Sequence, residues 1–225
     1  MKWFVRLFAL LAMVSLSVGV RTLANASPYS TTTEYKIGDT LPKAKTKAKG
    51  KTAAPAVNAA DYRKLNWDEL LPPDWDPMKA IKGMDYSKLK DSDPRAIEAL
   101  QKAKEEWDKA PVVEGLNGVK VNVAGFVVPL DIDVDHVKEF LIVPYFGACI
   151  HVPPPPSNQV IHIIVPKSIS LAQHALLKDA VETQNPVEVS GVMQTSPSYT
   201  TMGASGYRIT ADLVEAYKAP AGQSQ

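Results

Sequence analysis

The chain has 225 residues, of which 45% are hydrophobic and 22% are charged, and its formal net charge at pH 7 is +1. This composition excludes a wholly disordered or collagen-like chain, and the near-neutral charge excludes a strongly basic nucleic-acid-binding surface. The single cysteine excludes an intrachain disulfide and an all-thiolate metal site. The composition therefore indicates a globular protein of one large or two small domains.

The N-terminus has the pattern of a secretory signal peptide. Lys2 and Arg6 form a positively charged region before an apolar run over residues 7–20, and Ala-Asn-Ala at 24–26 supplies small residues for cleavage. We predict a signal peptide over 1–26, cleaved after Ala26, and a periplasmic or secreted protein. The apolar run is shorter than the ~20 residues that span a bilayer, so we expect membrane association only if the segment stays uncleaved.

Two different segments follow the signal peptide. Residues 27–60 are rich in Thr, Lys, Ala and Pro without apolar periodicity, which predicts a disordered basic linker. For residues 61–110 the sequence predicts an arm, over residues 61–93, and then a helix, both packed on the core. Trp67 and Trp75 lie among prolines and acidic residues in the arm, where they either pack flat on the domain or dock a partner.

The helix of this segment has a clear start signal. Asp93 is the expected N-cap and Pro94 the first helical residue. Helical spacing predicts one apolar face, formed by Ile97, Leu100, Ala103 and Trp107.

Residues 111–218 read as a mostly β domain with a helix, and we expect a disordered tail over 219–225. Short apolar runs predict strands at 119–128, 137–145, 159–165, 187–193 and 207–217, with a helix over 168–181. Gly125 is the expected bulge of the first strand, and residues 195–206 are expected to form a mobile loop. The order β-β-β-α-β-β is that of an OB-like five-stranded β-barrel, an α+β fold.

The loop 145–159, between the second and third predicted strands, carries the residues with most chemistry. Cys149 and His151 lie two apart, so in extended backbone they share a face, and both suit zinc or copper. His162, early in the third strand, is the third candidate metal ligand. By contrast, Asp131, Asp133, Asp135 and His136 are expected about 25 Å away in a solvated turn, and His174 is a weak candidate on the helix.

Two alternatives to a metal site stay open at this loop. Cys149 has the character of a small buried hydrophobe, or it serves as a catalytic or redox thiol with a nearby histidine as base. The prolines at Pro153, Pro154, Pro155 and Pro156 form a stiff extended segment. Together with Trp67 and Trp75, these prolines are the predicted partner-binding residues of a metal-free adaptor.

Three segments of the chain resemble those of a family of exported bacterial proteins known only as a domain of unknown function. The matching runs are Gly-Phe-Val-Val-Pro-Leu at 125–130, Phe-Leu-Ile-Val-Pro-Tyr at 140–145, and Gly-Ala-Cys-Ile-His-Val-Pro-Pro-Pro-Pro at 147–156 followed by Asn158 and Gln159. Because that family includes lipoproteins and proteins encoded beside ABC transporters, the resemblance implies an envelope or transporter partner. The cysteine that would carry a lipid after the signal is lacking here.

The sequence thus predicts an exported, non-catalytic module that binds zinc or copper at Cys149 and His151, with His162 as a further ligand. The alternatives are an adaptor that docks a protein through the proline segment, and a cysteine-dependent enzyme or redox protein. We expect no nucleic-acid partner, because the second and third strands lack interleaved basic and aromatic residues.

Overall fold

The structure of the chain, a computed structural model, describes residues 35–43, 58–77, 79, 93–132, 136–152 and 154–219. The predicted signal peptide and residues 220–225 of the predicted tail lie outside these ranges. Within the described ranges, no helix is long and apolar enough to cross a membrane.

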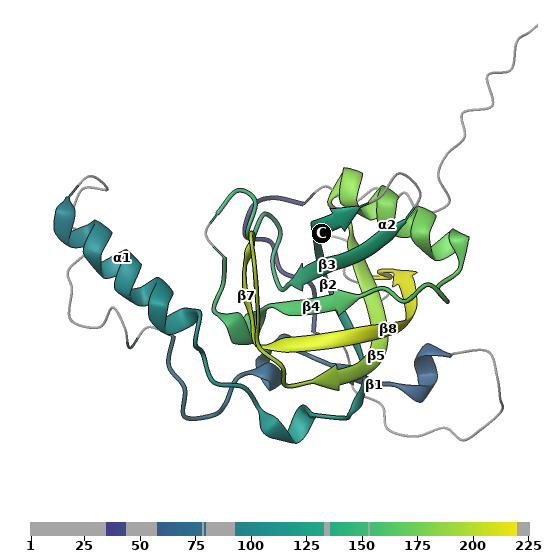
Figure 1. Cartoon of the computed structure of the whole chain (residues 1–225), viewed down its shortest axis with the longest axis horizontal. Coiled ribbons are helices and arrows are strands. Elements are labelled where there is room, and N and C mark those ends of the chain that lie inside the picture. Colours follow the sequence, from purple (N-terminus) through teal and green to yellow (C-terminus); the bar gives the residue numbers. More distant parts are fainter. Residues whose placement is uncertain are drawn as a thin grey trace, which may run out of the picture. The chain divides into compact units, whose positions relative to one another are not determined.

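Five strands close into a β-barrel (Figure 1). They are β2 (Lys120–Ile132), β3 (Val137–Val143), β4 (Ile161–Ile164), β5 (Pro186–Gln194) and β8 (Tyr207–Ala216). Their order around the barrel is β2-β3-β4-β8-β5, and β5 pairs back with β2. The β4–β8 pair is parallel and the other barrel pairs are antiparallel. The predicted OB-like α+β class is therefore confirmed.

Strand β2 closes the barrel because it is long enough to pair with two strands in succession. Residues 120–126 pair with β5, and residues 126–132 pair with β3. Phe126 lies at the crossover, opposite both Val143 and Pro186. A short strand, β1 (Arg63–Leu65), adds to β2 in parallel.

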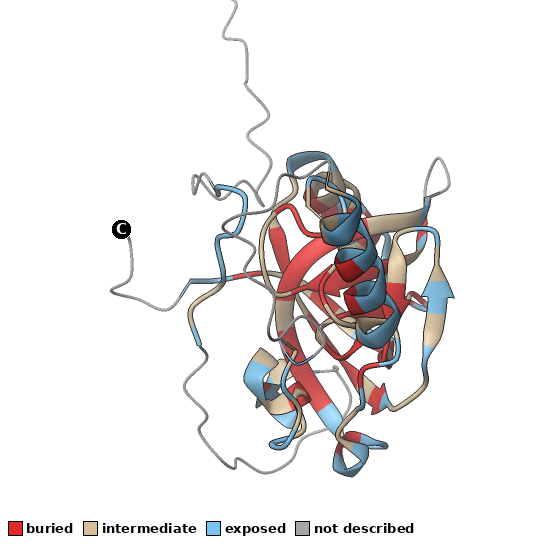
Figure 2. Ribbon diagram, turned by 90° about the vertical axis from the view of Figure 1, so that its left-hand side faces the viewer, coloured by how far each residue is buried: buried red, intermediate tan, exposed pale blue. Residues whose placement is uncertain are grey.

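The core lies inside the barrel, where the apolar residues of the strands are buried (Figure 2). Helix α2 (Leu171–Thr183) packs against β8, β2, β3 and β5, and the side chain of Ser170 caps its first turn. Gln173 fixes the helix to the barrel, because its Oε1 accepts a hydrogen bond of 2.8 Å from the Val214 N–H of β8. The buried residues of α2 are His174, Leu176, Leu177 and Ala180.

The remaining elements are short, apart from one long helix. They are the 3-10 turns η1 (Ala59–Asp61), η2 (Trp67–Leu70), η5 (Glu114–Leu116) and η6 (Ser157–Gln159), helix α1 (Pro94–Trp107), and strands β6 (Ser198–Thr200) and β7 (Gly203–Ser205). Strands β6 and β7 form an antiparallel hairpin within residues 195–206, where a loop was predicted. Its short polar strands gave no apolar alternation by which the sequence could indicate them.

Helix α1 begins as predicted, with the Asp93 side chain accepting a hydrogen bond from the Arg95 N–H and Pro94 in the first turn. The predicted apolar face is wrong in part. Ile97 and Leu100 are 55% and 54% exposed, whereas Ala99 and Ala103 are buried. The packing of α1 on the barrel stays a prediction.

Gly125 is not a bulge, because its pairing with Val187 continues the regular register of β2 and β5. The irregularities of β2 lie between Pro129 and Ile132 instead. Gly125 is needed for close packing: a Cβ atom there would lie 3.0 Å from Cζ2 of Trp67 and 3.0 Å from Cβ of Ile142. The glycine thus lets the arm indole lie directly on β2.

Part of the expected linker packs on the barrel. Residues 35–43, here called the strap, hydrogen-bond to Phe146, in the segment that follows β3. Gly38 N–H donates to Phe146 O at 2.9 Å, and Phe146 N–H donates to Asp39 O at 2.8 Å. The ring of Tyr35 contacts the ring of Phe126 edge-on, with centroids 5.0 Å apart. The structure differs from the predicted disordered linker at these residues. Tyr35 and Phe126 are far apart in the sequence, so no local apolar pattern indicates their contact.

We predict that Gly125→Ala destabilises the fold by about 1–3 kcal/mol, because the added methyl group must displace Trp67 or Ile142. Gly115→Ala is the matched control, since a Cβ atom at Gly115 would have no neighbour within 4 Å. Urea unfolding of both variants measures the difference. Equal stability of the two variants would contradict the close packing of Trp67 on β2.

Candidate functional site

The loop between β3 and β4 is a compact turn rather than an extended segment. The N–H groups of Ile150, His151 and Val152 all point to the Gly147 carbonyl oxygen, at 3.3, 2.8 and 3.2 Å. Gly147 has a φ of 83°, and Cys149 has a φ of 65°, in the left-handed region that non-glycine residues rarely adopt. The assumption that Cys149 and His151 share a face of extended backbone is therefore wrong.

Cys149 is half-buried against an apolar cluster at one end of the barrel. The cluster consists of Phe126, Val128, Leu141, Val143, Ala148 and Val160, with Tyr35, Leu41 and Met202 among the partly buried side chains packed on it. Burial raises the pKa of Cys149 to about 11. The thiol is consequently protonated at neutral pH, which disfavours a nucleophilic or redox role.

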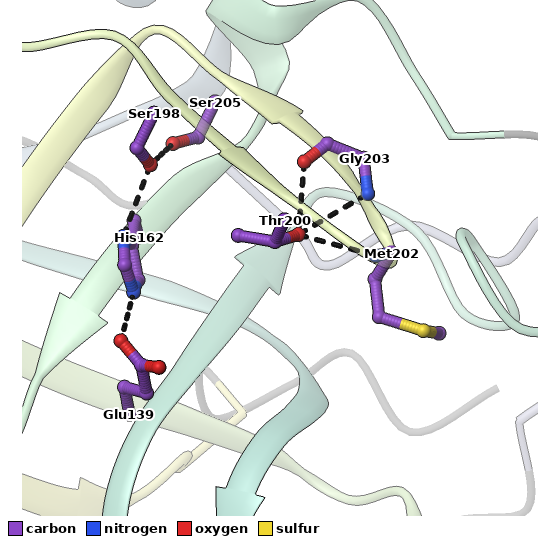
Figure 3. A network of polar contacts seen from close by, with 7 residues as sticks. All are labelled: Glu139, His162, Ser198, Thr200, Met202, Gly203 and Ser205. Atoms are coloured by element: carbon purple, nitrogen blue, oxygen red, sulfur yellow. Dashed lines mark hydrogen bonds and ion pairs between the residues drawn. The ribbon is translucent and has the colours of Figure 1, made fainter.

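His162 lies on β4 and is buried, and both of its ring nitrogens have partners (Figure 3). Its Nε2 is 2.8 Å from Oε2 of Glu139, and its Nδ1 is 3.0 Å from Oγ of Ser198. Neither nitrogen is left for a metal ion. Cys149, His151 and His162 do not come together as a metal-binding group, and the described part of the chain holds no other group of three. The metal prediction thus retains only Cys149 and His151.

The contacts of His162 also rule it out as part of a hydrolytic triad. In such a triad the imidazole Nε2 faces the serine and Nδ1 faces the carboxylate, which is the reverse of the arrangement here. The Ser198 hydroxyl also hydrogen-bonds to the Ser205 hydroxyl, with the two Oγ atoms 2.7 Å apart. We interpret the network as an anchor that holds the β6–β7 hairpin to β3 and β4. Thr200 closes the hairpin turn by accepting from the N–H groups of Met202 and Gly203 (Figure 3).

A groove of about 740 Å³ lies between the strap, the arm and the barrel. Three segments form its walls: Thr40–Lys43 of the strap, Lys64–Asp68 of the arm, and Pro155 and Pro156 of the loop 145–159, here called the proline loop. The other lining residues are Asn122, Ala124, Pro144, Tyr145, Gln159, Glu188, Tyr217 and Lys218. Its volume is within the ~300–1,000 Å³ typical of ligand sites.

The groove brings together three of the six predicted partner-binding residues, namely Trp67, Pro155 and Pro156. Pro154 lies against the β6–β7 hairpin instead: a Cβ atom added at Gly203 would be 3.0 Å from the Cβ atom of Pro154. Pro153 lies outside the described residues. Trp75 lines a second cavity of about 420 Å³, together with Trp107.

Hydrogen bonds fix the groove walls to one another. The Trp67 indole N–H donates to the Ala124 carbonyl oxygen at 2.8 Å, which holds the arm on β2. Gln159 Nε2 then donates to the Trp67 carbonyl oxygen at 3.0 Å, which joins the end of the proline loop to the arm. The walls are thus preorganised for binding.

The charged residues of the groove are mostly paired. Lys43 pairs with Asp68, and Lys64 lies 3.6 Å from Glu188. Lys218 is exposed and forms no ion pair with any residue that the structure describes. The sequence analysis missed Lys64, Glu188 and Lys218, because only the closed barrel brings residues so distant in sequence together.

Comparison with known proteins points to one family. A family model described as "Protein of unknown function (DUF3299)" matches residues 67–216. The crystal structure of a DUF3299 family protein from Pseudomonas aeruginosa PAO1 is 30% identical, covering 71% of this chain and 98% of that chain with a TM-score of 0.50. No curated protein matches the sequence.

Two OBody proteins bound to hen egg-white lysozyme, AM3L09 and AM2EP06, are also similar to the chain. They are 14% and 16% identical, and the matches cover 48% of this chain and 90% and 88% of theirs. Their TM-scores are both 0.29, too low to support a conclusion about this chain.

We predict that Cys149 reacts slowly with iodoacetamide at pH 8. A thiol with a pKa of about 11 is ionised at this pH roughly two hundredfold less than one of pKa ~8.5. The rate of alkylation in the folded protein should therefore be lower by that factor than in urea, where the thiol is exposed. Mass spectrometry follows the alkylation, and equal rates in the two states would show that burial does not suppress ionisation of the thiol.

We also predict that His162→Phe destabilises the protein by about 1–3 kcal/mol, because it leaves the Ser198 hydroxyl without its partner on β4. Glu139→Gln keeps an acceptor for the imidazole and should cost less. Urea unfolding at pH 7 compares the two. If His162→Phe unfolds at the wild-type midpoint, the network does not anchor the hairpin.

Proposed function

Since the chain belongs to the DUF3299 family, as the resemblance of its sequence indicated, and that family is described only as a protein of unknown function, we propose a function from the chain's own residues. We propose an exported, non-catalytic adaptor whose groove binds an extended segment of a protein partner in the bacterial envelope. The observation that carries this proposal is the meeting of Trp67 with Pro155 and Pro156 on the walls of one groove.

The composition of the groove suits an extended peptide. Proline and aromatic side chains offer flat apolar surfaces that lose little conformational freedom on binding, as in the grooves that bind proline-rich segments. Here these surfaces come from Trp67, Tyr145 and the two prolines, and Asn122 and Gln159 add polar groups. The raised pKa of Cys149, on the neighbouring apolar cluster, supports a non-catalytic role.

The charges of the groove specify the partner further. Lys43 and Lys64 are paired with Asp68 and Glu188, so Lys218 supplies the one uncompensated charge among the described lining residues. We therefore propose that the bound segment carries an acidic residue that pairs with Lys218. Such a pair at the rim of an interface mainly raises specificity and the association rate.

Zinc or copper binding at Cys149 and His151 remains the competing proposal for the same loop. His151 is exposed and lies two residues from the thiol, so these two ligands would need further ligands from solvent or from another chain. Elemental analysis of protein purified without chelator, beside the His151→Ala variant, tests this proposal directly.

The adaptor is tested by photo-crosslinking in cells. A benzophenone amino acid replaces Thr40, which is exposed on the groove wall, and in a second protein it replaces Lys167, an exposed residue that does not line the groove. We expect one discrete adduct from position 40, which mass spectrometry identifies as an envelope protein, and none from position 167.

Binding of the identified partner then shows whether the groove is responsible. With purified proteins, Lys218→Glu should weaken binding about tenfold, whereas Lys167→Glu should leave it unchanged. The same adduct from both positions, or an affinity insensitive to Lys218→Glu, would contradict the proposal.

A further inference from the structure

Two histidines outside the groove meet although they are distant in the sequence. His136 immediately precedes β3, and His174 lies in the first turns of α2. Their ring centroids are 4.8 Å apart, and the ring planes make an angle of 75°. From the sequence, His136 belonged to a solvated turn and His174 was a weak candidate ligand, with nothing to connect them.

His174 is one of the few buried side chains whose polar atoms lack partners, and among the described residues it alone has two such atoms. It is 4% exposed, and neither Nδ1 nor Nε2 has a hydrogen-bond partner. Buried polar groups in proteins are almost always paired, as both nitrogens of His162 are here. A buried imidazole without partners costs stability, so its retention on the barrel-facing side of α2 points to a ligand.

The electrostatic surroundings keep His174 in the form that binds metals. Burial and, to a smaller extent, the neighbouring His136 lower the pKa of His174. The ring is therefore neutral at neutral pH and retains a lone pair on one nitrogen, which is the form in which imidazole ligates metals.

The spacing of the two rings also suits a shared ion. With a Zn–N distance of ~2.0–2.1 Å, two imidazoles on one tetrahedral ion have ring centres about 5 Å apart. The observed 4.8 Å is close to this separation. The edge-to-face contact of the rings has to change, and His136 is exposed and therefore free to turn its ring.

We propose that His136 and His174 bind one divalent transition-metal ion, with solvent completing its coordination. Neutral imidazoles without a thiolate suit zinc, copper and nickel rather than calcium or magnesium. The ion would join the segment before β3 to α2 and so stabilise the packing of the helix on the barrel. This site is separate from the groove, and its existence does not depend on the proposed adaptor function.

Zinc chloride is the probe. Calorimetric titration of the untagged protein should show one zinc ion per chain, and zinc should raise the melting temperature. We expect His136→Ala and His174→Gln each to lower the zinc affinity at least tenfold. His151→Ala and Cys149→Ser are the matched controls, and both should bind zinc as the wild type does.

His136→Ala decides the outcome if His174→Gln fails to fold, because His136 is exposed and its removal leaves the core intact. In NMR spectra, zinc should shift the imidazole signals of His136 and His174 and leave those of His162 in place. Zinc binding that is lost in His151→Ala or Cys149→Ser would assign the metal to the proline loop and overturn the proposal. A failure to bind zinc at millimolar concentration would overturn it as well, and the two rings would then be an aromatic packing pair.

Discussion

The hydroxyl group of Tyr207 holds two segments outside the barrel in place. The residue opens β8 and is fully buried, so its hydroxyl must find partners within the protein. It donates to the Leu70 carbonyl oxygen at 2.8 Å and accepts from the Val113 N–H at 2.7 Å. One phenol therefore binds both the arm and the segment that leads into β2. Because Trp67 lies on the same short turn as Leu70, the wall of the groove depends on this buried contact.

The groove is built from segments that are each fixed by a different contact. The strap is held by backbone hydrogen bonds to Phe146, and the arm by Tyr207 and by the Trp67 indole. The proline loop is held at its end, where Asn158 Nδ2 donates to the Pro111 carbonyl oxygen at 2.9 Å. None of these segments is part of the barrel, yet the strap and the arm contact β2, and the proline loop connects β3 to β4. The barrel thus acts as a rigid base for the segments that form the groove.

Local sequence patterns were sufficient to predict the strands of the barrel and their order along the chain, whereas its closure through the β2–β5 pairing was not visible in them. Apolar runs located all five strands and α2 in the right order, and the Asp93-Pro94 pair located the start of α1. The features that local patterns did not predict depend on backbone conformation or on contacts between residues far apart in the sequence. The positive φ of Cys149 cannot be seen in a Cys-x-His spacing, and it removed the shared face on which the metal prediction rested.

The structure shows how the residues of the candidate site are arranged, which the sequence did not. Trp67, Pro155 and Pro156 line one groove, whereas both ring nitrogens of His162 are hydrogen-bonded, to Glu139 and Ser198. Both partners are polar residues on neighbouring strands, and neither stands out before the strand order is known. Likewise, the helical position of His174 was visible in the sequence, whereas its contact with His136 required the packing of α2 on the barrel.

The double pairing of β2 has a consequence for how the chain folds. The first half of β2 pairs with β5, which comes much later in the chain. Both β4 and β5 pair with β8, the last of the described strands in the sequence. Until residue 216 is available, the sheet is open, and its edge strands are free to pair with other chains. A chain with so many contacts between distant residues folds slowly. Chaperones that cover these edges until β8 is paired would therefore raise the yield of native protein.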